Sequence, residues 1–135
     1  MRSITVYPGL LDEIRAHART VYPMEACGLL VGRDATATRF VPTPNILSSP
    51  TAYEIDPAAL ASTFRSLRES GEQLIAIMHS HPAGPAHPSQ QDLERAYYPD
   101  VIHIIVSLAD PEKPQIRAFR IIDAQGYEVE VHAIL

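Results

Sequence analysis

The segment LIAIMHSHP, residues 74–82, is the most informative stretch of this sequence. It begins with an unbroken apolar run and then changes to histidine, serine and histidine before a proline. A short run of this kind is typical of a strand that is covered on both faces. The segment therefore predicts a buried strand whose carboxyl end carries His79 and His81.

Three helices are expected around this strand. Residues 10–21 repeat apolar side chains at helical spacing after a Pro-Gly pair. A second helix is expected to begin after Asp56, which is a suitable N-cap, with Pro57 at its first position, and to end at Gly71. Ser89 has the sequence context of the N-cap of a further helix.

Further strands are predicted on both sides of the central one, at residues 27–32, 38–41, 101–108, 115–122 and 127–131. The first two form a hairpin with a turn near 33–34, and the last two form a hairpin across 123–126. The C-terminal strand pairs either within its own sheet or across a dimer, and neither is favoured. The element order is that of a mixed α/β protein, and 135 residues suit a single domain spanning 1–135.

Composition narrows the class of protein. With 46% hydrophobic residues the chain has enough apolar material for an ordinary core. A net charge of -5 disfavours nucleic acid and anionic membranes as partners. No apolar run is long enough to span a bilayer or to act as a leader, so we expect a soluble, cytoplasmic protein. The single cysteine, Cys27, cannot form an internal disulfide and is expected to pack in the core.

A metal site is the first chemical prediction. His79 and His81 alternate with Ser80, so in a strand both imidazoles leave the same face. Asp92 reaches the same point if the proline-rich loop after Pro82 turns back. Three ligands with one open position is the arrangement of a catalytic zinc site, whereas a structural site normally has four ligands.

Hydrolysis of an amide also needs a general base and a group that stabilises the oxyanion. Glu25 lies in a tight segment before the strand that starts at Cys27, where its orientation can be fixed. Ser89 is placed to donate a hydrogen bond to the oxyanion. Structural roles remain open for both, because Glu25 alone is typical of a solvated carboxylate, and Ser89 with Asp92 is typical of a capped helix. The three remaining histidines singled out, His87, His103 and His132, are assigned no function.

These residues resemble the motif of the JAMM (MPN+) family of zinc metalloproteases. The family has a glutamate well upstream, then His-x-His-Pro, and Ser-x-x-Asp after a fixed interval. This chain has Glu25, HSHP at 79–82 and SQQD at 89–92. The resemblance extends to EACGLL at 25–30 and to YEIDP at 53–57, and covers roughly residues 3–122.

The resemblance implies that His79, His81 and Asp92 hold Zn²⁺, that Glu25 is the general base and that Ser89 steadies the oxyanion. It also implies a curved mixed β-sheet flanked by helices, similar to the cytidine deaminase layout. The deaminases themselves use His-x-Glu with Pro-Cys-x-x-Cys, and neither motif is present.

Family members hydrolyse peptide or isopeptide bonds at the C-terminus of ubiquitin or ubiquitin-like proteins. The chain is short and resembles compact prokaryotic members that act on sulfur-carrier proteins with a Gly-Gly tail. Such a tail can add to an exposed strand edge beside the zinc, with residues 45–53 as a candidate wall of the groove. Two alternatives stay open: an MPN-type binding module with a latent or structural zinc site, and a zinc amidohydrolase that acts on small peptides.

Overall fold

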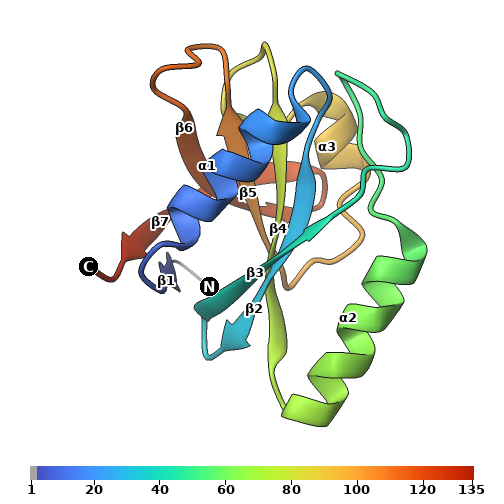
Figure 1. Cartoon of the computed structure of the whole chain (residues 1–135), viewed down its shortest axis with the longest axis vertical. Coiled ribbons are helices and arrows are strands. Elements are labelled where there is room, and N and C mark those ends of the chain that lie inside the picture. The colour runs from blue at the N-terminus through green and yellow to red at the C-terminus, as the bar shows by residue number, and fades with distance from the viewer. Residues whose placement is uncertain (1–2) are drawn as a thin grey trace.

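The computed structural model of the protein describes residues 3–135 as seven strands and three helices (Figure 1). The strands are β1 (Ser3–Val6), β2 (Cys27–Arg33), β3 (Thr36–Thr43), β4 (Gln73–His81), β5 (Ile102–Ser107), β6 (Gln115–Ile122) and β7 (Gln125–Ala133). The helices are α1 (Leu10–Val21), α2 (Pro57–Ser70) and α3 (Gln90–Glu94). The chain is therefore a mixed α/β protein, as the sequence predicts.

The sheet is strongly curved and closes on itself in the order β1-β3-β2-β4-β5-β6-β7. β4 pairs antiparallel with β2 and parallel with β5, which makes the sheet mixed. Closure depends on β1, which pairs parallel with both β3 and β7. The predicted curved mixed sheet is confirmed, and its closure is a feature that the sequence analysis did not include.

The sequence patterns predict the helices well. α1 spans the residues expected of it, and its buried positions Leu10, Ile14 and Ala18 form one stripe. α2 begins as predicted, because the side chain of Asp56 accepts a hydrogen bond from the Ala59 N–H. It ends at Gly71, whose φ of 73° is the left-handed conformation that glycine adopts without strain.

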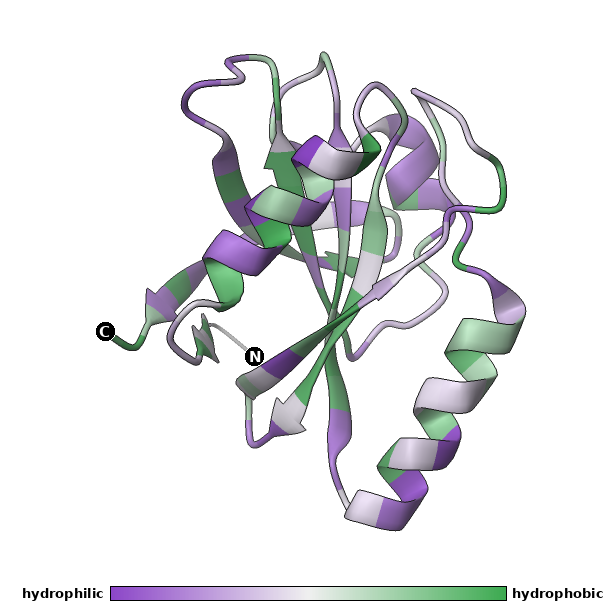
Figure 2. Cartoon of the chain, viewed as in Figure 1, coloured by the Kyte–Doolittle hydropathy of each residue, from purple (hydrophilic) through white to green (hydrophobic). Residues whose placement is uncertain are grey.

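The helices lie on different sides of the sheet. α1 packs on one face, where its apolar stripe joins Met78, Ile104 and neighbouring strand residues in the main core. α2 and α3 lie on the other side, where Leu60 of α2 packs with Leu29 and Ile77 in a second cluster. Figure 2 shows the apolar stripes of α1 and α2 and the mostly apolar strands β2, β4 and β5. The central strand β4 thus has two covered faces, as its apolar run predicts.

The remaining differences from the sequence analysis are at the chain ends and turns. The short strand β1 was not predicted, since four alternating residues give a weak signal. β7 pairs within its own sheet, with β6 and β1. Its hairpin turn is tighter than expected, because only Asp123 and Ala124 lie between the strands, both with positive φ. Among residues 3–135, no helix is long and apolar enough to cross a membrane.

Candidate metal centre

Three predicted ligands meet at the carboxyl end of β4. Asp92 Oδ2 lies 3.1 Å from His79 Nε2 and 3.0 Å from His81 Nε2. The two Nε2 atoms are 3.1 Å apart. Both histidines are buried and leave β4 on the same face, because they alternate with Ser80. One oxygen and two nitrogens therefore converge on a single point.

The loop between β4 and α3 brings Asp92 to this point. The His81 Nδ1 atom lies 2.8 Å from the Pro85 carbonyl oxygen, and the Ser107 hydroxyl donates to the Gly84 carbonyl (2.7 Å). These bonds fold the loop back over β5. α3 then starts with a capping box, in which the Ser89 hydroxyl accepts from the Asp92 N–H and Asp92 Oδ2 accepts from the Ser89 N–H.

The geometry fits a zinc ion. Ligand atoms about 2.0–2.1 Å from a tetrahedral zinc lie about 3.3 Å from one another, close to the separations found here. Two imidazoles and a carboxylate are ligands that zinc commonly takes. Burial alone would raise the pKa of Asp92, but its hydrogen bonds with His79 and His81 outweigh burial and hold that pKa well below the usual range. Asp92 is therefore ionised, as a metal ligand must be.

Glu25 is held beside the two histidines by its backbone. Its N–H donates to the Ser49 carbonyl (2.8 Å), and its carbonyl accepts from the Asn45 side chain (3.0 Å). The next residue, Ala26, donates its N–H to the Ser80 hydroxyl (2.8 Å). Because Ser80 stands between His79 and His81, this bond ties the start of β2 to the end of β4 at the level of the ligands.

The Glu25 carboxyl is buried and in part unpartnered. Only 4% of the residue is exposed, and Oε1 has no hydrogen-bond partner within residues 3–135. Burial raises its pKa to about 7, with His81 opposing the shift and Asp92 adding to it. A carboxyl group with this pKa can both take up and release a proton at neutral pH.

An open cleft of about 750 Å³ lies next to the convergence point. Its lining is Leu47, Tyr53, Glu54, Ile55, Pro57, Leu60, Ile77, His79, Gln91, Asp92, Arg95, Tyr97, Tyr98 and His103. The Tyr53 ring stacks on the His79 ring with centroids 4.5 Å apart. Aromatic and aliphatic side chains thus form a binding surface that reaches two of the candidate ligands.

The segment 45–53 has a divided role. All the hydrogen-bonding groups of the Asn45 side chain are used internally: its amide donates to Glu25 and Ala52, and its oxygen accepts from Leu47 and Glu54. Asn45 therefore braces the loop and leaves no group to contact a substrate. Leu47 and Tyr53 do line the cleft.

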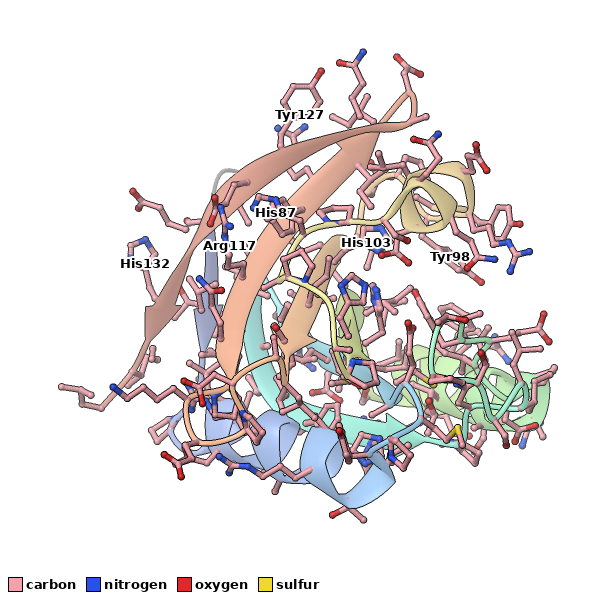
Figure 3. All side chains as sticks on the ribbon, turned by 90° about the horizontal axis from the view of Figure 1, so that it is seen from above. His87, Tyr98, His103, Arg117, Tyr127 and His132 are labelled. Carbon is pink, nitrogen blue, oxygen red and sulfur yellow. The ribbon has the colours of Figure 1, made fainter. Side chains whose placement is uncertain are left out.

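Unsatisfied polar atoms gather in this region. Among residues 3–135, the buried side-chain atoms without a hydrogen-bond partner are Glu25 Oε1, His79 Nδ1 and His103 Nε2. Buried polar atoms are nearly always paired, so exceptions mark places where a ligand, water or reacting group belongs. His103, which the sequence analysis assigned no function, lies in the interior near Tyr98 and α3 (Figure 3). Burial and the neighbouring His79 lower its pKa to about 4, so it is neutral at pH 7.

The other histidines and the cysteine lie outside the ligand set. His87 contacts Arg117 (2.6 Å), and His132 pairs with Glu130 (3.2 Å), both on the β6–β7 side in Figure 3. Cys27 is buried and free, as predicted, and burial raises its pKa.

Sequence reasoning missed Ser80, placed Asn45 in the wall of the groove where the structure shows it bracing the loop, and left His103 without a role. A signal existed for Ser80, since the small polar residue between the two histidines must face away from them. Asn45 and His103 act over long sequence separations, and no local pattern indicates their contacts.

Comparison with known proteins identifies the family. The family model described as prokaryotic homologs of the JAB domain matches residues 8–122. The chain is 34% identical to the CysO-cysteine peptidase of Mycobacterium tuberculosis, over 99% of this chain and 97% of that protein. It is 47% identical to a probable TtuB-protein conjugate cleaving protease of Thermus thermophilus, over 65% of this chain and 60% of that protein.

A solved structure agrees with these matches. The solution structure of a Desulfitobacterium hafniense protein superposes with a TM-score of 0.88 at 36% identity, and the match covers 97% of this chain and 92% of that one. The family model, the full-length peptidase relative and the shared fold agree with one another. The chain therefore belongs to the compact prokaryotic branch of the JAMM (MPN+) metalloprotease family, and it is a hydrolytic enzyme.

Proposed function

We propose that the protein is a zinc-dependent peptidase or isopeptidase that cleaves the amide bond at the C-terminus of a ubiquitin-like protein of the sulfur-carrier type. The observation that carries this proposal is the convergence of His79, His81 and Asp92 within 3.0–3.1 Å of one another, beside the buried carboxyl of Glu25. A set of three protein ligands leaves one coordination position for chemistry.

His79 and His81 would hold zinc through Nε2, and Asp92 would hold it through Oδ2. Zinc bound there supplies a Lewis acid, which polarises the scissile carbonyl and makes a water molecule at the site more acidic. The hydrogen bond from the Ser89 N–H keeps the Asp92 carboxylate in place (2.9 Å). The contact between His81 Nδ1 and the Pro85 carbonyl fixes the orientation of the His81 ring.

Glu25 is proposed as the general base. Its unpartnered Oε1 takes a proton from the attacking water, and the same carboxyl returns the proton to the leaving amine. A pKa of about 7 suits both steps. The Ser89 hydroxyl accepts a hydrogen bond from the Asp92 N–H and keeps its own proton, which it donates to the oxyanion that forms during attack.

The substrate class rests on the relatives and on the cleft. The two peptidase relatives are named for cleaving CysO-cysteine and TtuB-protein conjugates, which supports a small carrier protein as the substrate here. A flexible Gly-Gly tail needs a channel that leads to the reacting atoms. The cleft between Tyr53 and α3 offers one, because its lining includes His79 and Asp92 together with Leu47 and Tyr97.

The test combines metal content with cleavage. Protein purified without a metal-affinity tag is analysed by elemental mass spectrometry, with His81→Ala beside the wild type. We expect about one zinc per wild-type chain and a large loss of zinc in the variant. Wild type should cleave a ubiquitin-like protein extended beyond its Gly-Gly tail, and a chelator should stop the cleavage.

Three outcomes would contradict the proposal in different ways. Full zinc content without cleavage of any tailed carrier would favour a binding module with a latent site. Equal rates on the tailed carrier and on a short peptide with the same tail would favour a small-peptide amidohydrolase. A folded wild type that takes up no zinc would remove the basis of the mechanism.

A further inference from the structure

The two histidines of the proposed metal site differ in what their second ring nitrogen contacts. Each presents Nε2 to the convergence point, so when zinc is bound through Nε2 the ring proton of both histidines must lie on Nδ1. His81 Nδ1 has an acceptor, the Pro85 carbonyl at 2.8 Å. His79 Nδ1 is buried and has no partner within residues 3–135. One ligand is therefore oriented by a hydrogen bond, and the other lacks one.

His103 is placed to supply what His79 lacks. In the parallel pair β4–β5, His103 lies opposite Ile77, and His79 lies opposite Ile105. Because side chains alternate along a strand, His79 and His103 lie on the same face of the sheet, one step apart diagonally. Both line the cleft, and Figure 3 shows His103 directed into the interior.

The unpaired nitrogens of the two rings are complementary. A neutral His103 whose proton is on Nδ1 has a lone pair on Nε2, and this Nε2 is the buried atom without a partner. His79 Nδ1–H is a donor without an acceptor. The third unpaired atom, Glu25 Oε1, comes from the segment before β2, whereas His103 is on β5, the strand that pairs directly with the His79 end of β4.

No direct hydrogen bond joins the two rings in residues 3–135. A buried water molecule between polar atoms is a common solution, since it satisfies both at little cost in free energy. We propose that a buried water accepts from His79 Nδ1–H and donates to His103 Nε2, which makes His103 the positioning residue of the His79 ligand. This inference rests on the proposed metal site.

This water bridge between His79 and His103 has a defined consequence for the site. It holds the His79 proton on Nδ1 and leaves the Nε2 lone pair directed at the convergence point. It also resists rotation of a ring that is otherwise fixed by stacking on Tyr53. Partners of this kind behind a metal ligand change metal affinity by about 10–100-fold when removed.

The experiment compares two replacements of His103 with a control on the same strand face. His103→Phe removes the acceptor and keeps a ring, whereas His103→Gln places an amide oxygen near the position of Nε2. Ile105→Val is the control, because Ile105 is fully buried on the same face and carries no polar group. The dissociation constant for zinc is measured by competition with a chromophoric chelator, and folding is checked by circular dichroism.

We expect His103→Phe to weaken zinc binding by about 10–100-fold, His103→Gln to recover most of the loss, and Ile105→Val to bind zinc like the wild type. Folded His103→Phe protein with wild-type zinc affinity would overturn the proposal. An increase in KM alone, with zinc affinity unchanged, would do so too, because it would place His103 against the substrate.

A second measurement reads the ring tautomers and needs no variant. In zinc-loaded wild type, ¹⁵N NMR of the histidine rings should show the His79 proton on Nδ1 and the His103 proton on Nδ1, which leaves His103 Nε2 free to accept from the water. A His103 ring protonated on Nε2 in the zinc-bound protein would contradict the water bridge and leave the proposed function intact. A folded wild type that binds no zinc would instead contradict the proposed function on which this inference rests.

Discussion

The two faces of β4 differ in composition and in how fully their side chains are paired. On one face, Ala76 and Met78 are fully buried in the main core under α1. On the other, Ile77, His79 and His81 point towards the cleft side of the sheet. The first face is apolar and closely packed. The second ends in the region where the unpaired buried atoms of Glu25, His79 and His103 gather.

Because of this difference, one face of β4 contributes mainly to stability and the other mainly to the chemistry of the site. A face filled by apolar side chains lowers the free energy of folding and has no group left to react. The opposite face retains unsatisfied polar atoms, which cost folding free energy unless a metal, water or substrate pairs with them. Ser80 joins the two, because it is on the core side and binds the backbone beside Glu25. Substitutions on the two faces should therefore affect different measurements.

The largest expected effect is on catalysis, at Glu25. Glu25→Gln removes the proton acceptor and keeps the shape of the side chain, so kcat should fall by about 10²–10⁴-fold. Zinc content should be unchanged, because Glu25 is not one of the three converging ligands. Cleavage rates on a tailed carrier protein test the fall in kcat, and metal content measured on the same samples tests the retention of zinc. Activity within a few-fold of wild type would show that another group is the base.

The site illustrates what a sequence can predict. Local patterns predict α1, the cap at Asp56 and the capping box at Ser89, because each depends on neighbouring residues. The alternation of His79 and His81 predicts their common face for the same reason. Closure of the sheet by β1 was not predictable, since it depends on pairing between the two ends of the chain.

Contacts across the sheet were equally inaccessible to sequence reasoning. The bond between Ala26 and Ser80 joins residues 54 positions apart, and Asn45 reaches Glu25 across 20 positions. His103 comes beside His79 only through the register of β4 with β5. An isolated histidine in an apolar strand gives no indication of that neighbour.

The second expected effect is on stability, at Met78 on the core face. Met78→Ala leaves a cavity in a fully buried position and should lower the free energy of unfolding by about 2–5 kcal/mol. Zinc content of the folded variant should match the wild type. Urea unfolding of the metal-free proteins measures the stability. Loss of zinc from folded Met78→Ala would show that the two faces of β4 are coupled.

The smallest expected effect is on the pH dependence of stability, at Glu25. Burial raises the pKa of Glu25 from 4.5 to about 7 in the folded, metal-free protein, with smaller contributions from His81 and Asp92. Between these pH values the unfolded chain has lost a proton that the folded chain still holds, so rising pH favours unfolding. The resulting loss of stability above pH 7 is at most about 3 kcal/mol, from 1.36 kcal/mol for each pKa unit.

Glu25→Gln cannot ionise, so in the presence of a chelator it should be more stable than the wild type at pH 8. The difference should shrink as pH falls from 7 to 4.5, because the wild-type carboxyl then becomes neutral in both states. Glu69→Gln, an exposed position on α2, is the control and should leave the pH dependence of stability unaltered. Thermal unfolding of the wild type and of both variants at pH 8 and pH 5 measures these differences in stability. A variant less stable than wild type at pH 8 would mean that the Glu25 carboxylate stabilises the empty site, and that the polar face of β4 is paired more fully than its contacts indicate.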